Sequence, residues 1–132
     1  MNGKFITSAD AERDQLDWGV MGWMSRPSTT NAKDLVVIEV DLQPGFGHAF
    51  HKHPNQEEVI YVVSGTVEQW IEQECQQMNP GDSAFIAADV VHASYNISSE
   101  PVKLVAILGP CVTDEGYELV EVFDQEPWAS LK

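Results

Sequence analysis

Three of the four histidines of this chain, His48, His51 and His53, lie in one short segment. Residues two apart in a β-strand project from the same face, so His51 and His53 would lie side by side if the segment is extended. Two imidazoles placed in this way can bind one metal ion. A His-x-His pair can also arise by chance in a polar strand, so the assignment depends on what else reaches the same face.

Glu58 and His92 are the residues that could complete a metal site. A short connection, residues 54–57, lets the chain reverse, and Glu58 then opens a run in which alternate apolar residues share its face. A carboxylate at the edge of an apolar interior needs a partner, and a cation bound by His51 and His53 would supply one. His92 would add a third imidazole if its strand packs against the first pair.

The elements that must position these residues are predicted to be short β-strands. Strands are expected at 18–24, 35–42, 48–53, 57–65, 66–73, 75–78, in two pieces within 83–97, at 102–110 and at 116–123. Short strands separated by Gly and Pro turns are typical of an all-β sandwich or barrel. The best helix candidate is residues 8–16, which opens on Ser8. We expect one domain, 1–132, with an N-terminal extension of residues 1–34.

Composition narrows the classes of partner. The chain has 132 residues and a formal net charge of −14, with no basic stripe for nucleic acid and no attraction to an anionic membrane. Cys75 and Cys111 form no CxxC pair, which predicts free thiols in a reducing compartment. The N-terminus lacks the apolar core of a signal peptide, and no apolar run is long enough to span a membrane. We therefore expect a cytoplasmic protein.

Two segments resemble the two motifs of the cupin family. The first motif is Gly, five residues, His-x-His, a short gap, Glu, six residues and Gly, and it matches Gly45 through Gly65. The second motif is matched by Gly81, His92 and Asn96, whereas Ala87 and Asp89 stand where the family usually has Pro and Gly. Asp tolerates the left-handed backbone conformation better than most residues, so we expect the turn at position 89 to survive.

The resemblance implies an all-β double-stranded β-helix, the jelly-roll or cupin barrel. It also implies that His51, His53, Glu58 and His92 bind one divalent metal ion, with Fe, Mn, Ni, Zn and Cu all suited to imidazole and carboxylate ligands. The spacing to Gly65 selects Glu58 rather than Glu57. His48 lies three residues before His51, so strict alternation would place it on the opposite face, as a surface or loop-packing residue.

An apolar pocket is expected beside the metal, with Val40, Ile60 and Val62 as wall residues. Gln69 would either place its amide in this pocket or lie on the surface, and Phe85 would be either a wall or outer packing. A small-molecule substrate or ligand is expected, with a homodimer in which the segment carrying Trp18 and Trp23 covers a partner's sheet edge.

Several functions fit such a site. The first is an oxygenase or dioxygenase acting on a small organic substrate. A Lewis-acid isomerase or lyase and a non-catalytic metal-containing binding or sensor protein are the alternatives. A purely structural module fits poorly with four intact ligands.

Overall fold

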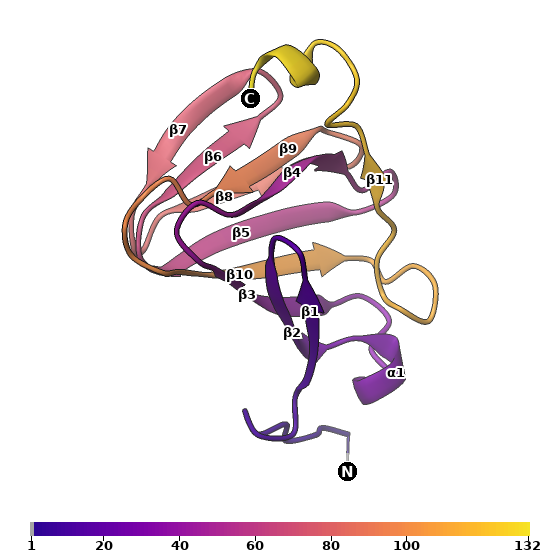
Figure 1. Cartoon of the computed structure of the whole chain (residues 1–132). Helices are drawn as coiled ribbons and strands as arrows, with labels where there is room; N and C mark the ends of the chain where they lie inside the picture. Colours follow the sequence, from indigo (N-terminus) through magenta and orange to yellow (C-terminus); the bar gives the residue numbers. More distant parts are fainter. Residues whose placement is uncertain (1) are drawn as a thin grey trace.

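The computed structural model describes residues 2–132, and in it two antiparallel sheets pack against each other (Figure 1). Met1, the first residue of the expected N-terminal extension, lies outside the described residues. The larger sheet has the order β1 (Glu12–Leu16), β2 (Gly19–Ser25), β3 (Val36–Leu42), β10 (Val102–Gly109), β5 (Glu57–Ser64), β8 (Ser83–Ile86). The smaller sheet has the order β11 (Val120–Glu121), β4 (Gly47–Lys52), β9 (His92–Tyr95), β6 (Val67–Ile71), β7 (Glu74–Met78).

Alternation along the strands explains where the core lies. In β3, Val36, Ile38, Val40 and Leu42 are buried while the residues between them are partly exposed. β5 and β10 follow the same pattern, and their inward side chains meet those of the smaller sheet in one apolar cluster. The prediction of an all-β fold is confirmed, because the helical content is limited to α1 (Pro27–Thr30) and a 3-10 turn at Trp128–Ser130 within residues 2–132.

The helix predicted at residues 8–16 is wrong, because residues 12–16 form the strand β1 instead. β1 pairs with β2 in an antiparallel hairpin, and β2 continues the larger sheet beside β3. Trp23 donates its indole N–H to the carboxylate of Asp14 at 2.9 Å across this hairpin. Pairing with β2 thus overrides a weak local helical preference, as tertiary contacts commonly do. Trp23 is buried in the chain's own core, so it is not available to cover a partner's sheet edge.

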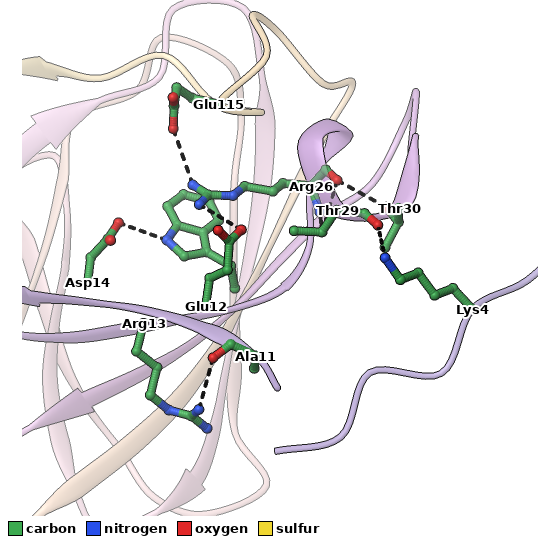
Figure 2. Close-up of polar contacts among 10 residues, drawn as sticks. Lys4, Ala11, Glu12, Arg13, Asp14, Arg26, Thr29, Thr30 and Glu115 are labelled. Atoms are coloured by element: carbon green, nitrogen blue, oxygen red, sulfur yellow. Dashed lines mark hydrogen bonds and ion pairs between the residues drawn. The ribbon is translucent and has the colours of Figure 1, made fainter. Parts of the chain in front are cut away.

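Arg26 ties the N-terminal hairpin to the C-terminal part of the chain, as Figure 2 shows. Its guanidinium lies 4.1 Å from the Trp23 ring and donates to Glu12 at 3.1 Å and to Glu115 at 3.2 Å. The guanidinium is buried whereas both carboxylates are largely exposed. Stacking and pairing together satisfy a charge that would otherwise be costly to bury.

The strand predicted at 116–123 is mostly wrong, because Val120–Glu121 alone forms a strand, β11 along the edge of β4, while Gly116 makes an isolated bridge with Val112. The preceding residues form a loop that crosses one end of the barrel, where its backbone is used to support the site described below. Neither helical segment within residues 2–132 has the length and apolarity needed to cross a membrane.

Candidate metal centre

Three buried imidazoles meet where the smaller sheet faces the larger one. β4 supplies His51, the residue just after β4 is His53, and β9 begins at His92, which pairs with His51 across the two strands. One ring nitrogen of each lies within 4.8 Å of the corresponding atoms of the other two. The alternation predicted for His51 and His53 is present, since the side chains on either side of Lys52 are both buried.

The other nitrogen of each ring is held by a backbone carbonyl. Nδ1 contacts the carbonyl oxygen of Ala49 at 2.7 Å in His51, of Glu118 at 2.8 Å in His53 and of Val90 at 3.0 Å in His92. Because a carbonyl oxygen can only accept, Nδ1 must carry the proton in all three rings. Nε2 is then the nitrogen with a free lone pair, which is the arrangement typical of metal-binding histidines.

Glu58 adds a carboxylate to the same place. Its Oε1 lies 2.7 Å from Nε2 of His92 and 3.4 Å from Nε2 of His53. Within residues 2–132, neither Oε1 of Glu58 nor Nε2 of His92 has a hydrogen-bond partner of good geometry. Glu57 is exposed on the other face of β5. Unpartnered buried atoms of these types fit a cation with nitrogen and oxygen ligands.

The electrostatics of the cluster favour a bound cation. Burial alone would raise the pKa of the Glu58 carboxyl, but its contacts with His53 and His92 outweigh burial and hold that pKa at about 2. Burial lowers the pKa of His51 well below its usual value. For His92 burial acts in the same direction, but the hydrogen bond and charge of Glu58, together with the backbone contact at Val90, outweigh burial and raise the pKa. Glu58 is therefore an ionised carboxylate and His51 a neutral imidazole at neutral pH.

The turn before β9 positions His92. Asp89 has a φ of 67°, the left-handed conformation that glycine would adopt here, so the expected turn is present despite the missing glycine. Its backbone N–H donates to the carbonyl of His53 at 3.0 Å, and its carboxylate pairs with Lys52 at 3.1 Å. The turn is thereby tied to the end of β4, which fixes the spacing between His53 and His92.

Gln56 supports the centre from behind, and sequence reasoning did not single it out. Its amide nitrogen donates to the carbonyls of Pro110 at 2.8 Å and Gly116 at 2.9 Å, and its amide oxygen accepts from the N–H of Glu118 at 3.1 Å. Glu118 is the residue whose carbonyl holds Nδ1 of His53. Gln56 thus fixes the loop that orients a candidate ligand, and no local sequence signal indicates contacts this distant along the chain.

A cavity of about 40 Å³ opens beside the imidazoles, between the two sheets. Most of its wall is apolar, and the polar side chains that reach it besides the candidate ligands are Ser94, Tyr117 and His48. Burial raises the pKa of the Tyr117 phenol, so it stays protonated at neutral pH. The residues lining the cavity are Trp18, Met21, Ile38, Val40, Leu42, His48, His51, His53, Glu58, Ile60, Ser94, Leu104, Ala106, Leu108 and Tyr117.

His48 lies on the same face as His51, which corrects the expectation from strict alternation. β4 contains one residue more than β9 between paired positions, since His48 pairs with Ser94 and His51 with His92. This bulge moves the side chain of His48 to the cavity face. The His48 ring stacks on His51 at 3.6 Å between centroids and on Trp18 at 4.1 Å.

The five pocket residues expected from the sequence occupy different places. Val40 and Ile60 line the cavity, whereas Val62 is fully buried in the core away from it. Gln69 is buried rather than at the surface, but it lies behind Ser94, whose hydroxyl donates to its amide oxygen at 2.6 Å. Phe85 points outward from β8 with 58% of its surface exposed.

Solved structures share this architecture. KdgF from a Halomonas species matches with a TM-score of 0.73 and 18% identity, over 85% of this chain and 97% of that one. Oxalate decarboxylase from Lactobacillus farciminis matches with a TM-score of 0.75 and 20% identity, over 88% of this chain and 35% of that one. A Klebsiella pneumoniae protein described as having a double-stranded β-helix domain matches with a TM-score of 0.70 and 23% identity, over 89% of this chain and 97% of that one. These similarities establish the fold, which is a double-stranded β-helix.

Sequence comparison adds the family. The chain is 35% identical over 76 residues to quercetin 2,3-dioxygenase from Bacillus subtilis, which is 58% of this chain but only 22% of that enzyme. The model of the cupin domain family matches residues 38–108, more than half of the chain and the part that contains every candidate metal ligand. With its two sheets and its cluster of three histidines, the chain belongs to the cupin family.

Proposed function

We propose that this protein is a metal-dependent oxygenase acting on a small organic substrate, with His51, His53, Glu58 and His92 as the ligands of one divalent transition metal. The observation that carries the proposal is the convergence of three imidazole Nε2 atoms and one unpartnered carboxylate oxygen at a mostly apolar cavity. Iron, manganese, nickel, zinc and copper all suit such ligands.

The ligand set determines the charge that a substrate would meet. One carboxylate against a dication leaves a site of about +1, since the imidazoles are neutral. Four protein ligands on a six-coordinate ion leave two positions for a substrate that chelates or for a substrate and dioxygen. When bound, a redox-active metal would supply electron transfer to dioxygen, and any of these metals would act as a Lewis acid.

The other side chains of the cavity would bind and shield the substrate. Apolar residues such as Met21, Ile38 and Leu104 exclude water around its carbon skeleton. The phenol of Tyr117 and the hydroxyl of Ser94 offer hydrogen bonds at the same wall. An apolar pocket with few, well-placed polar groups is the usual form of a small-molecule site. The similarity to a protein named as a dioxygenase supports oxygenation over the other reactions open to this centre.

Metal analysis of tag-free protein is the first test, followed by reconstitution with each candidate ion and a screen for dioxygen uptake. The substrates screened should be small molecules able to chelate through two oxygens. We expect one metal per chain and substrate-dependent dioxygen consumption. Turnover that continues without dioxygen would instead indicate a Lewis-acid isomerase or lyase. A bound metal with no turnover would indicate a binding or sensor protein.

A further inference from the structure

His48 is a fourth imidazole at the centre that the candidate ligand set does not use. Its ring is nearly parallel both to His51, with an angle of 12° between planes, and to Trp18, with an angle of 10°. Trp18 belongs to the turn that joins β1 to β2, so the stack connects the N-terminal hairpin to the metal centre. The position of His48 is therefore fixed from both sides of its ring.

The edge of the His48 ring carries an unsatisfied polar atom. Nε2 is buried and has no hydrogen-bond partner among residues 2–132, although the side chain lines the cavity. It is not part of the group of nitrogens that lie close enough together to share an ion, which comprises His51, His53 and His92. A buried imidazole nitrogen without a partner costs stability, and such costs persist where a ligand satisfies the group.

We propose that His48 is a substrate-positioning residue, whose Nε2–H donates a hydrogen bond to an oxygen of the metal-bound substrate. This inference rests on the proposed function, because it requires the substrate to occupy the positions that the four ligands leave open. The parallel stack places the His48 ring one aromatic thickness from the candidate ligand His51. A molecule beside His51 in the cavity would therefore lie next to the edge of both rings.

The cavity also defines the class of substrate. No lysine or arginine is among the side chains of residues 2–132 that line it, so the metal centre must balance the charge of the ligand by itself. A centre of about +1 is neutralised by one negative charge. A volume of about 40 Å³ favours a small ligand over a bulky one. These features point to a monoanion with two chelating oxygens and a short aliphatic chain, such as a small 2-oxo or 2-hydroxy acid.

Binding of 2-oxobutanoate to the Co²⁺-loaded full chain tests the inference, with the visible absorption of Co²⁺ as the readout. His48→Phe keeps an aromatic ring in the stack and removes the nitrogen, whereas His48→Gln offers an amide near the position of Nε2. We expect His48→Phe to bind Co²⁺ as the unchanged protein does and to raise the Kd for 2-oxobutanoate about tenfold, the effect of one hydrogen bond. His48→Gln should recover most of the lost affinity.

The results separate this inference from the proposed function. If the unchanged protein takes up no Co²⁺, the metal centre and with it the proposed function are wrong. If Co²⁺ binds but both variants bind 2-oxobutanoate as the unchanged protein does, the role of His48 alone is overturned. Loss of Co²⁺ from His48→Phe also overturns it, because His48 would then support the metal rather than the substrate. Failure of 2-oxobutanoate to change the Co²⁺ spectrum of the unchanged protein overturns the substrate class.

Discussion

Oε1 of Glu58 and Nε2 of His92 lie 2.7 Å apart, yet neither has a hydrogen-bond partner of good geometry within residues 2–132. Nδ1 of His92 already donates to the carbonyl of Val90, so Nε2 turns a lone pair toward the carboxylate unless a cation lies between them. In the metal-free protein a proton on Nε2 can be that cation, as the raised pKa of His92 indicates. A metal ion held by the neighbouring imidazoles would accept the lone pairs of both Nε2 of His92 and Oε1 of Glu58.

Glu58→Gln should weaken metal binding by more than about tenfold, because it removes the only negative charge of the proposed ligand set with little change in shape. Glu57→Gln is the matched control, since Glu57 is exposed on the opposite face of the same strand. Metal content after dialysis and calorimetric titration provide the measurement. Similar losses in the two variants would show that Glu58 is not a ligand.

Gln56→Leu should lower metal affinity about 10- to 100-fold without touching a proposed ligand. The substitution removes the hydrogen bonds that fix Gly116 and Glu118, and the carbonyl of Glu118 then no longer orients His53 firmly. Gln76→Leu, at an exposed position on β7, is the control. Circular dichroism would establish that the variant is folded, and unchanged affinity in a folded Gln56→Leu protein would contradict this role.

The metal-free protein should lose stability as the pH falls below about 6.5. Burial lowers the pKa of His51 well below 6.5 and that of His48 to about 3, so the unfolded chain binds more protons in this range. His92 has the opposite sign, because its raised pKa contributes stability that is lost as the pH rises. Glu58, with its pKa lowered from 4.5 to about 2, adds a loss of stability only at more acidic pH, below about 4.5.

Two histidines with a lowered pKa against one with a raised pKa should reduce the free energy of unfolding by about 1 kcal/mol between about pH 7.5 and about pH 5.5. Urea unfolding of chelator-treated protein at these two values is the measurement. A free energy of unfolding that stays constant or increases on acidification would mean that the buried histidines do not dominate this pH range.

Trp18→Ala should widen the range of ligands that the cavity accepts. Trp18 forms part of the cavity wall, and the present volume of about 40 Å³ is too small for a polycyclic ligand such as quercetin. We expect the Co²⁺-loaded variant, but not the unchanged protein, to show a spectral change with quercetin. Trp128→Ala, in the separate apolar cluster near the C-terminus, is the control. A spectral change of equal size in the unchanged protein would contradict the proposed size limit.

Homodimer formation stays a prediction, and the outer face of the larger sheet is the surface that would carry it. Tyr61, Val63 and Phe85 expose apolar area on neighbouring strands of this face. Light scattering should give the mass of a dimer at about micromolar concentration. Phe85→Glu should shift the mass toward the monomer, whereas Phe5→Glu, near the N-terminus, should not. A monomer mass for the unchanged protein would contradict the prediction.

The sequence predicts those parts of the site that depend on local geometry. Glu58 and the His51 and His53 pair follow from the two-residue period of a strand, and the motif spacing adds His92. The position of His48 depends on a bulge between paired strands, which no local pattern indicates. The role of Gln56 cannot be predicted from the sequence either, because its partners Pro110, Gly116 and Glu118 become neighbours only when the barrel closes.

The helix predicted at residues 8–16 fails for a related physical reason. Every side chain of β1 is exposed, so burial gives this segment no two-residue pattern that would mark it as a strand. Its conformation is set instead by the backbone ladder with β2 and by the contacts of Asp14 with Trp23 and of Glu12 with Arg26. Such cross-strand partners cannot be assigned before the pairing is known.

The extra residue in β4 lies between His48 and the two candidate ligands of the strand end, His51 and His53. Downstream of it, the two histidines keep a fixed spacing because His51 remains paired with His92. Upstream of it, a substitution at His48 would change the wall of the cavity while the backbone pairing of His51 with His92 is kept. Ligand preference could therefore diverge among descendants of this chain by single amino-acid changes before the bulge, while the capacity to bind a metal is inherited unaltered.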